Sequence, residues 1–431
     1  MKYVIIGGSA GGIGACEAIR EVDPVGELAL ISEELFPQYS RPMISDLVSG
    51  KASFEKMKYR GDAFWQKNNV ELKDGQKAVH LDFKEKCVDL DNGEKVGFER
   101  LLIATGGKPI VPKTDGVDKK GVFTFTTVSD AERLAAIVKK NQRAVVIGGG
   151  LIGVSVADAL VKRGVVVTVV ELKDRILNLI LDEAASRIIE DVMEDSGITI
   201  VTGQTVKSII GKFEDDTVVE GVILSNGEEI PCDYVIFAIG VVPRTELVVG
   251  TDVKTNRGII VDKHMQTNVP DVYACGDVAE VYDFVYGENR VLPLWPTAYL
   301  GGKVAGYNMA GKKTEFPGGT AMSALKYFKV PVISVGLVNP VNDDDFDVVI
   351  HHDPLRNVYR KAVLRHNNIV GFTLVNDIER AGILFFLMHS LLDVKEFSGI
   401  LVSDDFSLAS LPSAVRSKLF MEGTRWTASP E

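Results

Sequence analysis

The sequence has few of the residues that most often build a reactive centre by themselves. It contains 4 cysteines and 6 histidines in 431 residues. The cysteines (Cys16, Cys87, Cys232 and Cys275) form no C-x-x-C pair, and the histidines show neither H-x-x-x-H nor H-E-x-x-H spacing. Common zinc sites and dithiol centres depend on such spacings. We therefore expect no metal site, and thiols that remain reduced.

Long apolar runs and excess positive charge are also missing. The most apolar stretch, AGILFFLMHSLL (381–392), is interrupted by His389 and Ser390 and is shorter than the roughly 18 residues of a membrane span. The first strand is predicted from Lys2 or Tyr3, which leaves no room for a cleaved leader. A net charge of −11 argues against general binding to nucleic acids or anionic membranes. We expect a cytoplasmic protein with no membrane span.

A complete dinucleotide-binding fingerprint is present in QRAVVIGGGLIGVSVADALVKRGVVVTVVELKDRIL (142–177). The glycines of G-x-G-x-x-G are Gly148, Gly150 and Gly153, between an apolar strand and a helix. Glu171 ends the next strand, 18 residues after Gly153. The glycines allow a tight turn and close approach of a pyrophosphate, and the helix N-terminus attracts its charge. Glu171 is placed to accept hydrogen bonds from ribose hydroxyls, so this segment predicts a dinucleotide site.

The N-terminal stretch YVIIGGSAGGIGA (3–15) repeats the pattern with one change. Reading from Gly7, the third glycine is Gly12, but the middle position is Ser9. A helix and the strand ELALIS follow, and the acid Glu33 stands 21 residues after Gly12. A turn without a nucleotide is the alternative, because glycine also eases ordinary packing. The duplicated strand–turn–helix–strand unit favours a second dinucleotide site, and the Ser9 hydroxyl could itself reach a phosphate oxygen.

Further segments fit a chain that holds two dinucleotides. ERLLIATGGKPIVP (99–112) and DYVIFAIGVVPRTEL (233–247) each run from a strand through A-x-G to proline, which indicates crossings between two interleaved domains. TNVPDVYACGDVAE (267–280) ends a strand just before Asp277. WPTAYLGGKVAGYNMAG (295–311) predicts a helix that begins near Pro296.

Together these motifs resemble the FAD-dependent pyridine-nucleotide oxidoreductases, which are flavoproteins with two dinucleotide-binding domains. That family includes NADH oxidases, coenzyme A disulfide reductases, rubredoxin and ferredoxin reductases, and the flavin half of nitrite reductases. QYSRPMIS (38–45) is most similar to the rubredoxin-reductase and nitrite-reductase branch. NDIERAGILFF (376–386) and LVSDDFSLASLP (401–412) look like NADH-linked flavoproteins that serve iron–sulfur enzymes.

The resemblance implies an α/β fold with two interleaved Rossmann-like domains and a C-terminal α+β domain. The FAD-binding domain would comprise 1–112 and 244–314, and the NAD(H)-binding domain 113–243. The C-terminal domain, 315–431, would cover the flavin or form a homodimer interface.

The same resemblance implies the site residues, with FAD on the first fingerprint and NADH on the second. The FAD site would comprise Gly7, Gly8, Ser9, Gly11, Gly12, Glu33, Glu34, Arg41, Pro42, Ala104, Thr105, Gly106, Asp277, Trp295 and Thr297. Here Glu33 would hold the adenosine ribose, with Glu34 as the alternative. The NADH site would comprise Gly148, Gly150, Leu151, Ile152, Gly153, Glu171 and Gly240.

Three departures from the family pattern bear on function. The loop 39–45 lacks the cysteine that disulfide reductases carry beside the flavin. Ser155 replaces a frequent glutamate near the nicotinamide, and Arg244 replaces a frequent asparagine after the second crossing. Lys173 and Arg175 follow Glu171, but that carboxylate would repel a 2′-phosphate, which favours NADH over NADPH.

These features predict an FAD-dependent NADH:acceptor oxidoreductase without a catalytic side chain, because the chemistry is carried by the flavin. Since no cysteine relay is expected, electrons would pass to an iron–sulfur protein or partner subunit. A peroxide-forming NADH oxidase and a flavin-holding assembly subunit without turnover are the alternatives. A cysteine-based disulfide reductase is disfavoured. The local basic excess of KASFEKMKYRGDAF (51–64) fits either a docking patch for an acidic carrier or an ordinary exposed helix face.

Overall fold

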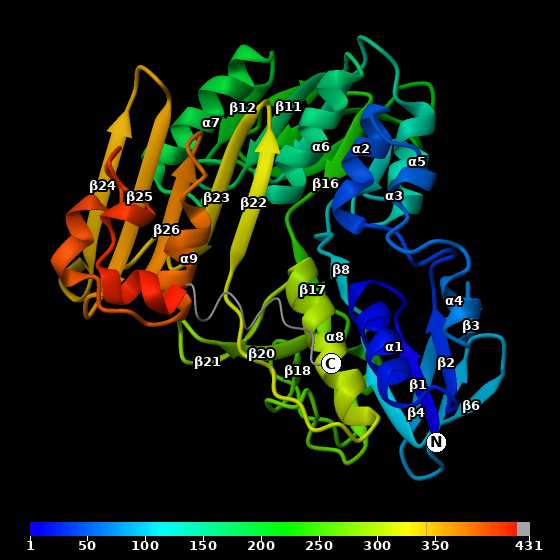
Figure 1. Cartoon of the computed structure of the whole chain (residues 1–431). Coiled ribbons are helices and arrows are strands. Elements are labelled where there is room, and N and C mark those ends of the chain that lie inside the picture. Colours follow the sequence, from blue (N-terminus) through cyan, green and yellow to red (C-terminus); the bar gives the residue numbers. More distant parts are fainter. Residues whose placement is uncertain (342, 420–431) are drawn as a thin grey trace. The chain divides into compact units, whose positions relative to one another are not determined.

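The computed structural model describes residues 1–341 and 343–419 of the chain (Figure 1). The backbone divides into two units. The first contains Met1–Leu172 and Gly197–Gly319, and the second contains Lys173–Ser196 together with the residues from Thr320 onward. The predicted subdivision into FAD-binding and NAD(H)-binding domains stays a prediction.

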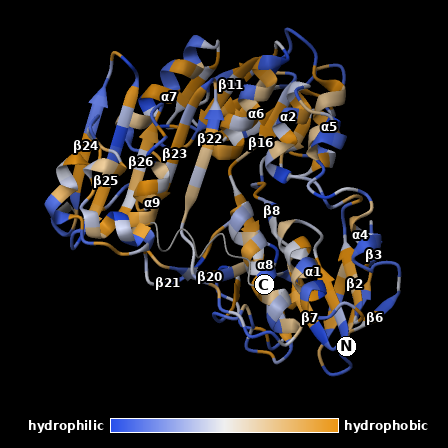
Figure 2. Ribbon diagram, in the orientation of Figure 1, coloured by the Kyte–Doolittle hydropathy of each residue, from blue (hydrophilic) through white to orange (hydrophobic). Residues whose placement is uncertain are grey.

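A five-stranded parallel sheet in the first unit carries the N-terminal turn. Its order is β19-β7-β1-β2-β3, and its strands are β1 (Lys2–Ile6), β2 (Glu27–Ser32), β3 (Glu71–Asp74), β7 (Arg100–Ile103) and β19 (Val272–Ala274). Except for β3 these strands are largely buried, and Figure 2 shows the apolar character around β2 as orange ribbon. Nearly continuous apolar strands are expected in a parallel sheet because both of its faces are covered.

Two helices pack closely beside this sheet, α1 (Ala10–Val22) and α8 (Trp295–Met309), and they lie side by side in Figure 1. Their glycines set the spacing. A Cβ added to Gly302 of α8 would lie 2.0 Å from the carbonyl oxygen of Gly11 in α1. The close approach of the two backbones fixes the start of α8 near the first turn.

A second five-stranded parallel sheet, of order β12-β11-β10-β16-β9, also belongs to the first unit. Its strands are β9 (Val122–Thr124), β10 (Arg143–Ile147), β11 (Val166–Glu171), β12 (Thr199–Thr202) and β16 (Tyr234–Phe237). Helix α5 (Val128–Ile137) follows β9, and α6 (Leu151–Lys162) connects β10 to β11. The repeated strand–turn–helix–strand arrangement confirms the predicted α/β class.

Smaller elements complete this unit. The antiparallel pair β8 (Gly107–Pro109) and β17 (Val241–Pro243) forms the two predicted crossings. The other small sheets are β4 (Ala78–Asp82) with β5 (Cys87–Leu90) and β6 (Lys95–Gly97), β13 (Val206–Gly211) with β14 (Val219–Leu224) and β15 (Glu229–Pro231), and β18 (Ile259–Ile260) with β20 (Ala279–Asp283) and β21 (Glu288–Val291). The short helices are α2 (Ile44–Ser49), α3 (Phe54–Met57) and α4 (Phe64–Lys67).

The second unit is built on an antiparallel sheet, as predicted for the C-terminal part. Its order is β22-β23-β26-β25-β24, with β22 (Met322–Tyr327), β23 (Val330–Gly336), β24 (Asp347–Asp353), β25 (Val358–Arg365) and β26 (Asn368–Val375). Helix α9 (Ala381–His389) packs on β26, and α7 (Glu183–Asp195) is also part of this unit. Within residues 1–341 and 343–419, no helix has both the length and the apolar character needed to cross a membrane.

Asp182 connects α7 to the C-terminal sheet. Its carboxylate caps α7 through the Ala185 N–H and accepts hydrogen bonds from the Tyr359 hydroxyl at 2.5 Å and the Lys361 ammonium at 2.7 Å. Burial would raise the pKa of Asp182, but the bonds from Lys361, Tyr359 and the Ala185 N–H outweigh it and leave the pKa below its ordinary value. The Lys361 side chain is only 8% exposed, so loss of its partner would leave a buried charge.

We expect Asp182→Asn to lower the free energy of unfolding of this unit by about 2–4 kcal/mol, because it breaks a buried ion pair while leaving an amide oxygen that can still cap α7. The folded pKa is depressed, so this contribution is present above about pH 4 and is lost as the pH falls through the folded pKa. Thermal unfolding at neutral and acidic pH measures both effects. As a control, Asp174→Asn removes the partner of Arg175, an ion pair whose carboxylate is 75% exposed, and should have little effect. Equal losses for the two variants would contradict the assignment.

Candidate functional site

The two glycine-rich turns occupy equivalent places in the two parallel sheets. The Gly7 N–H donates to the carbonyl of Ile31 at 2.8 Å, and the Gly148 N–H donates to that of Val170 at the same distance. Both glycines have left-handed backbone angles, with φ of +114° and +107°. Each turn therefore leaves the central strand in the same way and leads into a helix N-terminus.

The third position of each fingerprint admits no side chain. A Cβ on Gly12 would lie 2.0 Å from the carbonyl oxygen of Gly7, and one on Gly153 would lie 1.8 Å from that of Gly148. Both distances are far below van der Waals contact. The helix can approach the strand this closely only with glycine at these positions.

The middle position has no such restriction. Ser9 has φ of −83° and Gly150 has φ of −79°, both ordinary values for any residue. No described atom lies within 4 Å of a Cβ built on Gly150. Serine therefore fits the first turn, and at the second turn the space beside Gly150 leaves room for a ligand's pyrophosphate at the N-terminus of α6.

The acids after the second strands of the two sheets differ in placement. Glu171 is buried and accepts a 2.6 Å hydrogen bond from the Gly149 N–H. By strand register, Glu171 follows the partner of Ile147, and the equivalent residue in the first sheet is Ser32, which follows the partner of Ile6. Glu33 and Glu34 therefore lie one and two residues beyond the position that Glu171 occupies.

Glu33 and Glu34 make different contacts in the structure. Glu34 accepts hydrogen bonds on one oxygen from the Tyr39 hydroxyl and on the other from the Arg41 guanidinium, both at 2.5 Å. Arg41 also donates to the carbonyl of Thr126 at 2.6 Å. Both carboxylate oxygens of Glu34 are thus engaged, whereas Glu33 is bonded through one oxygen, by Arg244. Glu33 is therefore the better candidate for a ribose hydroxyl.

Further predicted FAD residues lie at the carboxyl ends of neighbouring strands. Ala104, Thr105 and Gly106 follow β7, and the Ala104 N–H donates to the carbonyl of Ile6 at 2.8 Å. Asp277 lies in a short 3-10 helix after β19. Burial raises the pKa of Asp277, and the positive charge of Arg41 opposes that rise.

The start of α8 supplies the last part of this candidate site. Trp295 is its first residue, with Pro296 in the first turn, as predicted. Its indole meets the Tyr59 ring edge to face, with ring centroids 5.2 Å apart. Thr297 lies in the same turn, where the free N–H groups of a helix N-terminus attract negative charge.

The structure therefore gathers the predicted residues into two groups. The first group is carried by the ends of β1, β2, β7 and β19 and by the start of α8, with Arg41 and Pro42 in the loop after β2. The second group lies at the ends of β10, β11 and β16, where Leu151 and Ile152 begin α6 and Gly240 follows β16. Glycine cradles, helix N-termini and an acid beside each turn fit an adenine dinucleotide at both places.

The cysteines are placed for packing. All four are buried and free in the described part of the chain. Burial raises the pKa of Cys232 and Cys275 to about 12. The Cys275 sulfur lies only 2.8 Å from where a Cβ on Gly11 would stand, so it is packed beneath α1. A thiolate nucleophile is therefore scarce at neutral pH.

Two of the basic residues in the stretch 51–64 form ion pairs with carboxylates. Lys58 lies 2.8 Å from both Glu55 and Asp62, and Arg60 lies 2.7 Å from Glu17. The docking-patch interpretation therefore loses its basis in charge. Among the residues that the structure describes, no group of three or more His, Cys, Asp or Glu side chains is placed to hold a metal ion.

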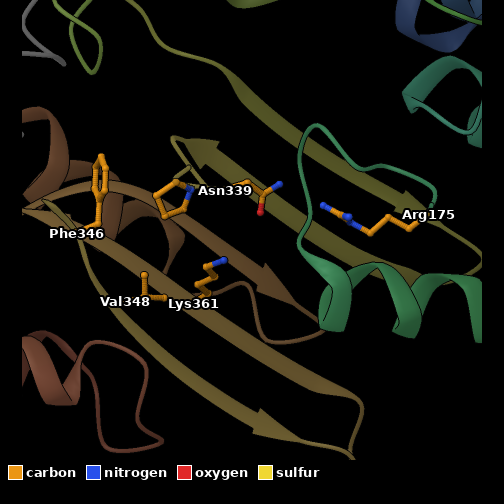
Figure 3. A pocket seen from close by; sticks show the side chains of 6 residues that line it. Arg175, Asn339, Phe346, Val348 and Lys361 are labelled. Atoms are coloured by element: carbon orange, nitrogen blue, oxygen red, sulfur yellow. The ribbon is translucent and has the colours of Figure 1, made fainter. Parts of the chain in front are cut away.

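Arg175 has partners inside the second unit. It pairs with Asp174 and lines a cavity of about 480 Å³ together with Asn339, Pro340, Phe346, Val348 and Lys361 (Figure 3). Both cations at this cavity already have carboxylate partners, Asp174 for Arg175 and Asp182 for Lys361.

Comparisons with known proteins agree with these observations. Residues 1–302 match the pyridine nucleotide-disulphide oxidoreductase family, and residues 322–390 match the rubredoxin NAD+ reductase C-terminal domain. A solved structure of NADH:rubredoxin oxidoreductase from Clostridium acetobutylicum has a TM-score of 0.76 and 26% identity, covering 93% of this chain and 97% of that chain.

Curated relatives show similar identities. The chain is 30% identical to the nitrite reductase (NAD(P)H) of Bacillus subtilis over 94% of this chain and 49% of the relative, and so spans about half of that protein. It is 31% identical to the NADH-dependent phenylglyoxylate dehydrogenase subunit epsilon of Aromatoleum evansii, over 89% of this chain and 90% of the relative. It is 32% identical to an NADH oxidase of Methanocaldococcus jannaschii, over 73% of this chain and 71% of the relative.

The twin glycine-rich turns on two parallel sheets agree with these matches. The chain belongs to the pyridine nucleotide-disulphide oxidoreductase family.

Proposed function

We propose that the protein takes electrons from NADH by way of FAD and delivers them to an iron–sulfur protein or partner subunit. The observation that carries this proposal is the combination of two glycine-rich turns, each suited to a dinucleotide, with four buried cysteines. A thiol relay has no nucleophile here, so electrons leave from the flavin itself. One solved relative is named an NADH:rubredoxin oxidoreductase, which supports an iron–sulfur protein as the acceptor. Another relative is named a subunit of an NADH-dependent dehydrogenase, which supports a partner subunit.

FAD would be held by the first group of residues and NADH by the second. The turn from Gly7 to Gly12 and the α1 N-terminus would receive the FAD pyrophosphate, Glu33 the adenosine ribose and Asp277 the ribityl chain. Gly148, Gly150 and Gly153 would receive the NADH pyrophosphate. When bound, FAD supplies the chemistry, since it accepts hydride from a reduced nicotinamide and can give up electrons singly.

The protein's own residues orient these groups and set their charge environment. The N-terminus of α8 at Trp295 presents free N–H groups and a partial positive charge. The Glu171 carboxylate, which accepts a hydrogen bond from the Gly149 N–H, would receive the NADH ribose. A 2′-phosphate there would meet this buried carboxylate, so NADH is the preferred donor. The ratio of kcat/KM for NADH and NADPH measures that preference.

Steady-state reduction of acceptors tests the proposed function. The FAD-loaded protein should be bleached by NADH, and it should then reduce a rubredoxin- or ferredoxin-type protein faster than it consumes oxygen. Oxygen consumption with stoichiometric peroxide, as fast as the reduction of any carrier, would instead establish the peroxide-forming oxidase, a second candidate supported by the NADH oxidase relative. A protein that stays oxidised in excess NADH would be a flavin-holding subunit without turnover.

A cysteine variant separates flavin chemistry from thiol chemistry. We expect Cys275→Ala to reduce acceptors within about threefold of the wild-type rate, because the lost sulfur is a packing group beneath α1. Cys275 is the cysteine nearest in sequence to the proposed ribityl aspartate, so it is the most demanding choice. Loss of turnover with FAD content unchanged would bring thiol chemistry back into the mechanism.

A further inference from the structure

Arg244, the residue that departs from the family pattern after the second crossing, has a defined place. Its backbone N–H donates to the carbonyl of Gly106 at 2.9 Å, and its carbonyl accepts from the Thr105 hydroxyl at 3.0 Å. Its guanidinium reaches the carboxylate of Glu33 at 2.6 Å. The main chain of Arg244 is therefore bonded to the segment that follows β7, and its side chain is bonded to Glu33, which follows β2.

The sheet order shows what this ion pair crosses. Strand β1 lies between β7 and β2. A link from the end of β7 to the end of β2 must therefore pass over the end of β1, where the turn from Gly7 to Gly12 begins. This turn is the proposed place of the FAD pyrophosphate, between the ribose at Glu33 and the flavin at Ala104–Gly106.

The pair is suited to act on a ligand more than on the stability of the fold. The two side chains are 35% and 48% exposed, and ion pairs at such positions contribute little to folding. The bond engages one oxygen of Glu33, Oε2, which leaves Oε1 for a ribose hydroxyl.

We propose that Arg244 and Glu33 form a clasp over the adenosine half of the FAD site, which must open before FAD can leave. Arg244 positions the Glu33 carboxylate for the ribose and links the segments that follow β7 and β2. This inference rests on the proposed FAD site. It assigns to this chain a cofactor-retaining residue that the complete fingerprint does not include.

The test is the rate at which FAD leaves the loaded protein, followed by flavin fluorescence after dilution into an excess of the apoprotein of an FAD-binding oxidase as a trap. We expect Arg244→Gln to release FAD about tenfold faster, the equivalent of one lost charge-assisted contact. Arg244→Lys should restore part of the retention. Raising the ionic strength should speed release from the wild type but not from Arg244→Gln, because salt screens the half-exposed pair.

Lys108→Gln is the matched control. Lys108 lies on β8, where it pairs with Glu246, so its loss removes one positive charge from the same crossing without touching Glu33. Its release rate should change by less than about twofold. The double variant Glu33→Gln with Arg244→Gln should release FAD no faster than Glu33→Gln alone, since both changes remove the same clasp.

Two results would overturn the clasp in distinguishable ways. If Glu33→Gln speeds release while Arg244→Gln stays within twofold of the wild type, the FAD site stands and the clasp fails. If Glu33→Gln itself has no effect, the proposed ribose contact is wrong and the clasp fails with it.

Discussion

Gly12→Ala is expected to give a protein that no longer retains FAD. The added Cβ would lie 2.0 Å from the Gly7 carbonyl oxygen, a backbone atom that cannot rotate away as a flexible side chain could. The turn must open or α1 must move away from β1, and either change moves the helix N-terminus that would receive the pyrophosphate. Overpacking of this kind costs about 1–3 kcal/mol, which corresponds to about a 5- to 150-fold loss of affinity if the whole cost falls on the FAD-bound form. The ratio of FAD to protein after purification measures it.

Ser9→Ala is the matched control in the same turn. Ser9 already carries a Cβ at an ordinary φ of −83°, so its alanine variant should keep FAD with at most a small loss from the missing hydroxyl. Circular dichroism and NADH binding at the second turn would show that Gly12→Ala remains folded. A folded Gly12→Ala protein with full FAD content would refute the placement of FAD on this turn.

The turns were predictable from the sequence because their physics is local. Gly7 and Gly12 are five residues apart, and the steric demand that makes Gly12 obligatory arises within the turn itself. The same holds for Gly148 and Gly153 in the second turn. At the middle position the sequence has Ser9 in place of glycine, and its φ of −83° is one that any residue can adopt. Strand, turn and helix therefore followed from the pattern at both places.

The acid after β2 shows where sequence spacing stops being informative. The spacing from the last glycine to the acid is 18 residues in one unit and 21 in the other, and the sequence alone left Glu33 and Glu34 open. Strand register shows that Ser32 in the first sheet is the residue equivalent to Glu171 in the second sheet. Only the contacts of Tyr39 and Arg41 with Glu34 separate the two glutamates.

Contacts between distant residues could not be predicted. Arg244 and Glu33 are 211 positions apart, and Lys361 and Asp182 are 179 apart. No periodicity links such pairs, because they form only when separate elements come together in the fold. Arg244 stood out as a departure from the family pattern, but its partner had no signal of its own.

Local charge counting could not decide between the two interpretations of the stretch 51–64, for a related reason. The stretch 51–64 has more basic than acidic residues, yet Lys58 lies beside Glu55 and Asp62 within the stretch, and Arg60 pairs with Glu17 from α1. A count of charges does not show which of them are already neutralised. The docking surface for an acidic carrier therefore has to be sought with the partner itself, since the sequence does not locate it.

Gly153→Ala is expected to remove NADH-dependent reduction while leaving FAD in place. A Cβ on Gly153 would lie 1.8 Å from the Gly148 carbonyl oxygen, so α6 must shift away from β10. A displacement of about 1 Å in a positioning element can cost about 100-fold in rate, and kcat/KM for NADH should fall by that order. Stopped-flow bleaching of the FAD-loaded variant measures it. Full-rate bleaching would contradict the assignment of NADH to this turn.

Gly150→Ala tests a direct clash with bound NADH separately from the displacement of α6 that Gly153→Ala causes. No described atom lies within 4 Å of its Cβ and its φ is −79°, so the variant should fold with an unchanged melting temperature. If the pyrophosphate approaches the backbone at this position, the methyl group occupies its place and KM for NADH should rise about tenfold, or about 1.4 kcal/mol. An unchanged KM would mean that the open space over the turn is not where NADH binds, however severe the effect of Gly153→Ala.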